Sequence, residues 1–207
     1  MTERKQISKL DAARRQLLAA IHIHWYMDEP IAVYSLAANV WEICDALLAR
    51  QNKIRILAEI TSSQGIMPRA VRDLINAPRN FVKHADRDPD TVIDDLSHSD
   101  CDAILLTACL DYMFANGRSP YCAGVFVAWY SAIYPEKTEL FFRSEAEAIF
   151  AGLAAESRER QVQAARDFLS RPPKVVLNDV RNELTDNYRW SNLKQIFGQM
   201  HYRENQA

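Results

Sequence analysis

Apolar residues recur at steps of three and four over long stretches of this chain, and this spacing restricts its fold class. Between residues 2 and 28 the apolar positions are Leu10, Ala13, Leu17, Leu18, Ile21 and Trp25. Between residues 32 and 51 they are Val33, Leu36, Ala37, Val40, Ile43, Cys44 and Leu47. Such spacing lines one face of an α-helix. Only Asp28-Glu29-Pro30 separates the two stretches, so we expect an antiparallel hairpin of two long helices.

The rest of the chain also favours helices over strands. It has only 5 glycines and 8 prolines in 207 residues, which are few turn formers for many short strands. With 48% apolar residues it can bury a substantial core. Further helices are expected over residues 53–64, 67–75, 100–114, 121–134 and 144–169. We therefore predict an all-α helical bundle built on the N-terminal hairpin.

Pro172-Pro173 is the best candidate for a domain boundary, because two prolines stop the long helix before them. Residues 1–170 then form the helical bundle. Residues 171–207 form a C-terminal helical appendage, with weaker helical segments over 174–188 and 193–200. The sequence leaves open whether this appendage packs on the same domain.

The N-terminus and the cysteines bear on the compartment. Residues 1–11 are polar and charged and lack the apolar stretch of a signal peptide. The sequence has no uninterrupted run of about 18 apolar residues, the length that would indicate a membrane span. The cysteines contain no Cys-x-x-Cys pair and are expected to be buried thiols; they are Cys44, Cys101, Cys109 and Cys122. We expect a cytoplasmic protein without a membrane segment.

Charge is unevenly distributed although the net charge is only −2. Residues 50–87 are rich in basic side chains: Arg50, Lys53, Arg55, Arg69, Arg72, Arg79, Lys83 and Arg87. Residues 88–102 contain aspartates and no lysine or arginine. Two interpretations remain open. The segments are two solvated faces, or the first is a surface for an anionic partner and the second repels that partner.

The stretch from Pro78 to Asp86 contains the polar side chains that are best suited to binding or catalysis. Proline suits the first position of a helix, so we expect a new helix to start at Pro78. With Arg79 at 0° on a helical wheel, Lys83, Asn80 and His84 fall at about 40°, 100° and 140°. The four side chains thus share one arc of the helix. The two apolar residues between them, Phe81 and Val82, fall outside this arc and are expected to anchor the helix to the core.

A helix start at Pro78 would favour an anion at this place. The first backbone N–H groups of a helix lack partners there, and the macrodipole is positive. Arg79 would add a bidentate contact to a phosphate, and Asn80 and Lys83 would assist its binding. Histidine suits proton transfer near neutral pH, which makes His84 a candidate general acid or base. The sequence therefore predicts a phosphate site at a helix N-terminus.

The string Arg79-Asn80-Phe81-Val82-Lys83-His84 resembles the hallmark of HEPN domains, an arginine and a histidine separated by four to six residues with a polar residue after the arginine. The resemblance covers about residues 1–115. HEPN domains are compact all-α bundles, and many are metal-independent endoribonucleases of toxin–antitoxin and phage-defence systems. The longer string Arg-Asn-Phe-x-Lys-His-Ala-Asp is also similar to a group of small bacterial proteins.

The resemblance implies specific roles and partners. Arg79 and His84 would be catalytic, with Arg79 steadying the charged phosphate and His84 moving the proton of the attacking 2′-hydroxyl. Asn80 would support them, and no metal or other cofactor would be needed. Two motifs would meet across the interface of a homodimer to cut RNA, and an antitoxin or another regulatory protein would be a further partner.

Two other interpretations of the same residues remain. In the first, the protein is a non-catalytic all-α binding or regulatory protein, in which Arg79 and His84 bind an anion or brace the fold. In the second, His84 and the aspartates of residues 86–95 form a divalent-metal phosphohydrolase. Those aspartates do not match an EF-hand, because Thr91 stands at its sixth position in place of glycine.

His22 and His24 are two residues apart on the first expected helix. Side chains at that spacing lie on different faces of a helix and cannot chelate one metal from that helix alone. We expect one of the two to face solvent.

Overall fold

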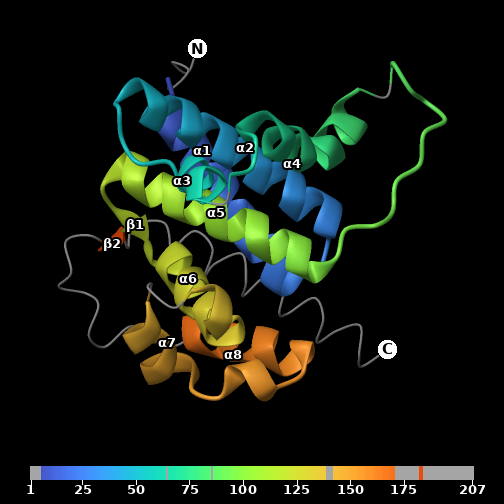
Figure 1. The fold of residues 1–207 in the computed structure, drawn as a ribbon. Coiled ribbons are helices and arrows are strands. Elements are labelled where there is room, and N and C mark those ends of the chain that lie inside the picture. The colour runs from blue at the N-terminus through green and yellow to red at the C-terminus, as the bar shows by residue number, and fades with distance from the viewer. Residues whose placement is uncertain (1–5, 64, 85, 139–141, 171–181, 184–207) are drawn as a thin grey trace, which may run out of the picture.

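The structure is a computed structural model that describes residues 6–63, 65–84, 86–138, 142–170 and 182–183. The described chain is helical apart from one pair of two-residue strands, which confirms the predicted all-α class. The helices of the first half, in blue to green, form an upper layer in Figure 1. Those of the second half, in yellow to orange, lie beneath it.

The N-terminal hairpin forms as predicted from α1 (Lys9–Tyr26) and α2 (Pro30–Arg50), which lie side by side in Figure 1. A capping box starts α1: the Ser8 hydroxyl accepts a hydrogen bond from the Asp11 N–H, and the Asp11 carboxylate accepts one from the Ser8 N–H. Pro30 occupies the first turn of α2, where its missing N–H costs no helical bond.

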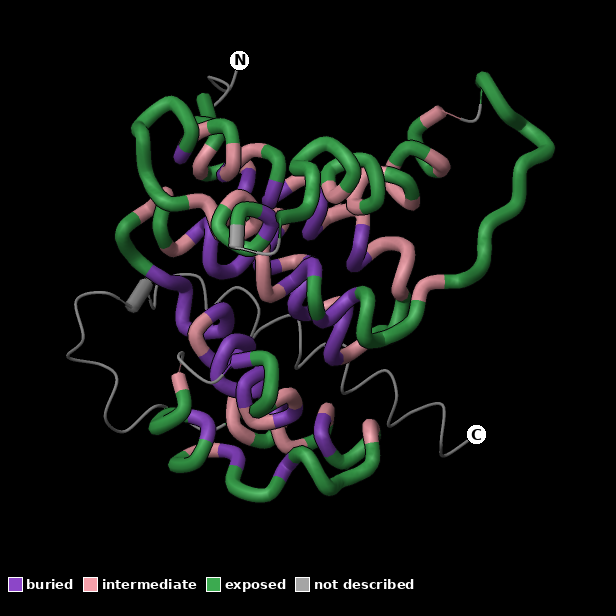
Figure 2. The backbone as a smooth tube through the Cα atoms, in the orientation of Figure 1, coloured by how far each residue is buried: buried purple, intermediate pink, exposed green. Residues whose placement is uncertain are grey.

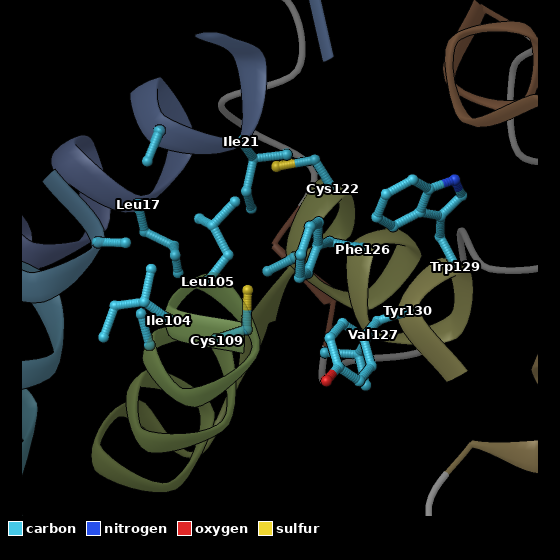
Figure 3. Packing of buried hydrophobic residues seen from close by; sticks show 14 of the residues in the cluster. Leu17, Ile21, Ile104, Leu105, Cys109, Cys122, Phe126, Val127, Trp129 and Tyr130 are labelled. Atoms are coloured by element: carbon cyan, nitrogen blue, oxygen red, sulfur yellow. The ribbon is translucent and has the colours of Figure 1, made fainter. Parts of the chain in front are cut away.

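The third main helix of the upper layer is α5 (His98–Asn116), which packs against both α1 and α2. A second capping box, between Ser97 and Asp100, starts it. Gly117 ends it with a φ of 70°, a left-handed conformation that suits glycine. Side chains of α1, α5 and the helix that follows α5, α6 (Tyr121–Ile133), interlock in the core, as Figure 3 shows. They include Leu17, Ile21, Leu105, Cys109 and Phe126.

Among the described residues, α2 is the one helix long and apolar enough to cross a membrane, judged by length and composition. The search for an uninterrupted apolar run did not detect α2, because Glu42 and Asp45 interrupt its apolar residues. In this structure α2 contacts α1 and α5, and its buried positions include Ala37 and Val40.

Two shorter helices pack on the outside of α2 and α5. They are α3 (Ile56–Ser63), which contacts α5, and α4 (Pro68–Lys83), which contacts both α2 and α3. No residue of α4 is fully buried, and Figure 2 shows this helix in the colours of exposed and intermediate residues. Residues 86–97 form a mainly exposed segment that begins with turns near residues 86–90 and projects from the body of the molecule in Figure 1.

The lower layer begins with β1 (Ser119–Pro120) and α6 (Tyr121–Ile133), followed by a short 3₁₀ helix, η1 (Pro135–Lys137). β1 pairs in parallel with β2 (Asn182–Glu183). α6 is buried on nearly all sides, as its apolar composition predicts. Its aromatic side chains are core residues; they are Tyr121, Phe126, Trp129 and Tyr130.

The single helix predicted over residues 144–169 is wrong. The structure has α7 (Arg143–Phe150), the 3₁₀ helix η2 (Leu153–Ala155) and α8 (Arg158–Ser170). The break falls at Gly152, whose φ of 74° is incompatible with a continuing right-handed helix. The chain turns there, so α7 and α8 both pack against α6.

Two further predictions concern the cysteines and the C-terminal residues. All four cysteines are buried free thiols, as predicted. Burial, with nearby carboxylates, raises the pKa of Cys44 and of Cys101 to about 12. The predicted appendage, residues 171–207, lies outside the described residues except for β2.

Candidate functional site

The predicted helix start at Pro78 is wrong, because α4 runs through this proline from Pro68 to Lys83. A proline inside a helix removes one backbone hydrogen bond and crowds the preceding turn. Tertiary contacts on both sides of Pro78 compensate for this loss. Ile75 packs against the hydrophobic core, and Arg79 pairs with Glu42 of α2.

The continuous helix reverses the electrostatics expected for the motif. Arg79, Asn80 and Lys83 lie in the last turns of α4, and His84 is its C-cap. The C-terminal end of a helix presents carbonyl groups and the negative end of the macrodipole. The predicted position of this motif at a helix N-terminus is therefore wrong, and any anion bound here would depend on side chains alone.

Arg79 is engaged within the chain. Its Nη1 lies 2.6 Å from Glu42 Oε2 and also donates to Asn76 Oδ1 at 3.3 Å. The Arg79 side chain is 16% exposed, whereas that of Glu42 is 55% exposed. This partly buried ion pair fastens the last turns of α4 to α2. Arg79 thus has a structural role in this structure, and Glu42 offsets its charge.

The other three motif residues remain available. Asn80 and Lys83 are exposed, and His84 is half-buried. The His84 backbone N–H donates to the Asn80 carbonyl at 3.0 Å. In the part of the chain that the structure describes, no side chain forms an ion pair with Lys83 and none hydrogen-bonds to the His84 imidazole. The structure therefore brings Asn80, Lys83 and His84 together at one exposed helix end, while Arg79 points into a contact with α2.

The predicted apolar anchor is correct only in part. Phe81 is half-buried, but Val82 is 49% exposed. Two further apolar residues of this region are more exposed, Met67 at 72% and Leu74 at 73%. The helix α4 thus carries uncovered apolar side chains as well as exposed basic ones.

The aspartates that follow α4 do not converge. Asp86, Asp88, Asp90, Asp94 and Asp95 are all exposed. Within the described ranges, no group of three or more His, Cys, Asp or Glu side chains is placed to hold a metal ion. These exposed carboxylates are distributed along the projecting segment, which favours the solvated interpretation of this charge run.

A buried polar cluster that the sequence did not predict joins the two layers of the fold. Its centre is Asp102 of α5, which is 0% exposed. Arg158 at the start of α8 donates from Nη1 to Asp102 Oδ2 at 2.8 Å and from Nη2 to Oδ1 at 2.9 Å. The Tyr134 hydroxyl donates to Oδ2 at 2.9 Å, and His24 Nε2 lies 2.7 Å from Oδ1. Three helices, α1, α5 and α8, and the residue between α6 and η1 therefore meet at one carboxylate.

Two neighbours make opposite demands on His24 Nε2. The Asp102 oxygen at 2.7 Å accepts and favours a proton on Nε2, whereas Arg158 Nη2 at 3.0 Å donates and could bond only to an unprotonated Nε2. The shorter carboxylate contact favours the proton on Nε2, and the Arg158 contact is then not a hydrogen bond. The ring also stands edge-on to Phe126 and Trp129, with both centroid distances at 6.0 Å.

Neither histidine of α1 faces solvent, so the expectation for His22 and His24 is wrong. His22 is 7% exposed and its Nδ1 lies 2.7 Å from the Leu18 carbonyl. His24 is 5% exposed because Asp102 offers it a buried partner. A sequence signal did exist for the aspartate. Asp102 precedes Leu105 by three residues on the core stripe of α5 and therefore had to be buried with a partner.

Electrostatics in the cluster favour the charged carboxylate. Burial by itself would raise the pKa of Asp102, but hydrogen bonds from His24 and Arg158 outweigh it and hold the pKa below its usual range. Burial and the neighbouring Asp102 charge raise the pKa of Tyr134. Both Asp102 oxygens are occupied by protein donors, so the cluster leaves no carboxylate oxygen for a substrate. It is a structural clamp.

Comparisons with known proteins identify no relative: no protein-family model, no curated protein and no solved structure matches the chain.

Proposed function

We propose that this chain is a non-catalytic helical binding protein and that α4 is the element that binds its partner. The observation that carries this proposal is that α4 is both fixed to the bundle and exposed. Arg79 holds the helix to α2 through Glu42, yet no residue of α4 is fully buried. A helix that is fastened in place while its outer face stays uncovered is suited to present that face.

The chemistry of this face favours an acidic amphipathic helix of a partner protein. Apolar residues follow each other at steps of four and three: Met67, Val71, Leu74, Pro78 and Phe81. The exposed basic side chains of α4 lie across the helix from this stripe; they are Arg69, Arg72 and Lys83. A partner helix would match the stripe with its own apolar residues, and its carboxylates would reach around α4 to these basic side chains.

A photo-crosslinking amino acid at position 74 tests this proposal. Expressed in the source cells, the Leu74 derivative is expected to crosslink to a segment with apolar residues at helical spacing and a net negative charge. The same group at Ile7, which is 52% exposed, is the control and is not expected to give that product. That segment, made as a peptide, should bind the Leu74→Glu variant at least about tenfold more weakly than wild type, and bind Ile7→Glu normally.

Other crosslinking outcomes contradict the proposal. Equal products at both positions indicate non-specific contact, and no product at position 74 indicates that α4 is not a binding element. A crosslink between two copies of the chain would replace the partner helix with a homodimer.

A metal-independent endoribonuclease is the second candidate, and the free His84 imidazole favours it. His84 lies beside exposed Asn80 and Lys83 and has no hydrogen-bond partner among the described side chains. The resemblance to HEPN domains implies that a homodimer would bring two such motifs together around RNA. In that case Arg79 has to leave Glu42 to reach the phosphate, since its guanidinium is engaged in the free chain.

Incubation with single-stranded and structured RNA in EDTA separates the two candidates. The ribonuclease candidate requires cleavage that His84→Ala abolishes. His98→Ala is the control and should leave cleavage intact, because His98 is an exposed surface histidine that contacts Asp28. Absence of cleavage excludes this candidate for the RNAs tested. Cleavage that requires Mg²⁺ or Mn²⁺ would support a metal-dependent phosphohydrolase.

A further inference from the structure

A second buried carboxylate, Asp111 of α5, holds the start of α3. Its Oδ1 accepts a hydrogen bond from the Ile56 backbone N–H at 3.0 Å. The first N–H groups of a helix have no partners within it, and an acceptor from another helix can supply one. Because Asp111 lies 55 residues away in the chain and is 0% exposed, this bond ties α3 directly to the core.

The other oxygen of Asp111 is poorly accommodated. Its Oδ2 is buried and has no hydrogen-bond partner among the described residues. Burying a charged oxygen without a partner is costly. Asp102 is also fully buried, but both of its oxygens accept hydrogen bonds. The two aspartates of α5 therefore have opposite preferences for the proton.

The charged groups around Asp111 come from three directions. From α2, Asp45 adds a second negative charge, and the Cys44 thiol stays neutral because burial and Asp111 raise its pKa to about 12. From the residue before α3, Arg55 partly offsets Asp111 while its Nη1 contacts Asp45 Oδ1 at 3.2 Å. From α4, Arg72 reaches Asp45 Oδ2 at 3.9 Å. Burial, assisted by Asp45, raises the pKa of Asp111 to about 6.

We propose that Asp111 is a proton-operated latch that sets how firmly α3 and α4 are held on the α2–α5 face. When Asp111 is protonated, the orphan oxygen carries no charge and the two helices sit firmly. When it ionises, the buried charge favours states in which α3 lifts away and water reaches the carboxylate. The contribution is present at low pH and is lost as the pH rises through about 6, because the folded pKa lies above the ordinary value of 3.8.

The architecture allows such a motion without unfolding the core. α4 buries no residue fully, and α3 exposes Ile60 at 45%. Separation of these two helices therefore uncovers less apolar surface than separation of α1, α2 and α5 would. The latch concerns the free protein and does not depend on what α4 binds.

Amide hydrogen exchange tests the latch, with each rate corrected for the intrinsic effect of pH. Between about pH 5 and pH 7.5, protection of α3 amides should fall about tenfold, the ratio set by pKa values of about 6 and 3.8. Protection in α1 and α6 should not change. The fall should vanish in Asp111→Asn, which keeps the accepting oxygen and cannot ionise.

Two further variants sharpen the test. Asp73→Asn makes the same chemical change on α4 at a side chain that is 70% exposed, and should retain the wild-type fall. Asp45→Asn removes the neighbouring negative charge and should move the midpoint to lower pH. An equal fall in Asp111→Asn would overturn the proposal. If that variant does not fold, the carboxyl ¹³C resonance of Asp111 in the wild type decides, and titration near 3.8 would overturn the latch.

Discussion

Arg158 presents both terminal guanidinium nitrogens to the carboxylate of Asp102, at 2.8 and 2.9 Å, across 56 residues of sequence. The guanidinium also lies over the Trp129 ring, 4.9 Å from its centroid. Planar, bidentate geometry of this kind is the arrangement in which arginine binds a carboxylate most strongly. Because Asp102 belongs to the upper layer and Arg158 to the lower one, this pair fastens the layers together.

Loss of Arg158 should destabilise the fold strongly. Arg158→Met leaves the Asp102 charge buried with His24 and Tyr134 alone, and breaking a buried pair typically costs about 3–5 kcal/mol. Urea unfolding followed by circular dichroism measures this loss. Arg160→Met removes an arginine two residues away that is 76% exposed, so a change of under about 0.5 kcal/mol is expected. Similar losses in the two variants would contradict the clamp.

The clamp should also weaken in acid. Because the folded pKa of Asp102 lies below the ordinary 3.8, its stabilisation is complete above that value and is lost as the pH falls through the folded pKa. The free energy of unfolding of wild type should therefore exceed that of Asp102→Asn by a constant amount above about pH 5. The difference should shrink below about pH 4. Urea unfolding of both proteins across this range checks the prediction, and a difference that persists undiminished in strong acid would refute it.

The pair between Arg79 and Glu42 should show measurable coupling. Arg79 is largely buried and Glu42 is half exposed, so a double-mutant cycle with alanine is expected to give about 0.5–1 kcal/mol. The control cycle uses Arg69 and Asp73 of the same helix, which are 89% and 70% exposed and 3.7 Å apart. Its coupling should be near zero. Equal coupling in the two cycles would show that Arg79 does not brace α4.

Two glycines should respond in opposite directions to alanine. Gly152 has a φ of 74°, so Gly152→Ala forces a left-handed conformation on a residue with a Cβ and should cost about 1 kcal/mol. Gly124 lies inside α6, where an added Cβ would meet Ser119 Oγ at an ordinary 3.7 Å. Gly124→Ala should raise the melting temperature slightly, since alanine favours helix. Thermal unfolding of the two variants measures both effects.

Sequence periodicity predicted the helices whose apolar stripes face one common core. This held for α1, α2 and α5, because burial of a continuous stripe dominates local preferences. The prediction of helix boundaries failed at two positions, each of which depended on the effect of a single residue. Pro78 was given too much weight, because contacts of Ile75 and Arg79 with the rest of the fold carry α4 through it. Gly152 was given too little, because its left-handed backbone ends α7.

The side chains of the candidate site were identified from sequence, but their environment was not. Asn80, Lys83 and His84 do share one end of α4. The engagement of Arg79 depends on Glu42, which lies on a different helix, and helical spacing within α4 carries no information about it. The same reason hid the clamp, because its partners His24, Asp102 and Arg158 come from three separate helices.

The position of Arg158 also has a consequence for synthesis of the chain. A ribosome completes α1, α2 and α5 well before it adds Arg158, so during that interval the emerging bundle has its Asp102 carboxylate without the guanidinium. The hairpin and α5 can collapse together, but the Asp102 carboxylate gains its guanidinium partner only when α8 arrives. The full stability of the bundle thus depends on its last described helix, and a chain interrupted before residue 158 is expected to be less stable than the whole.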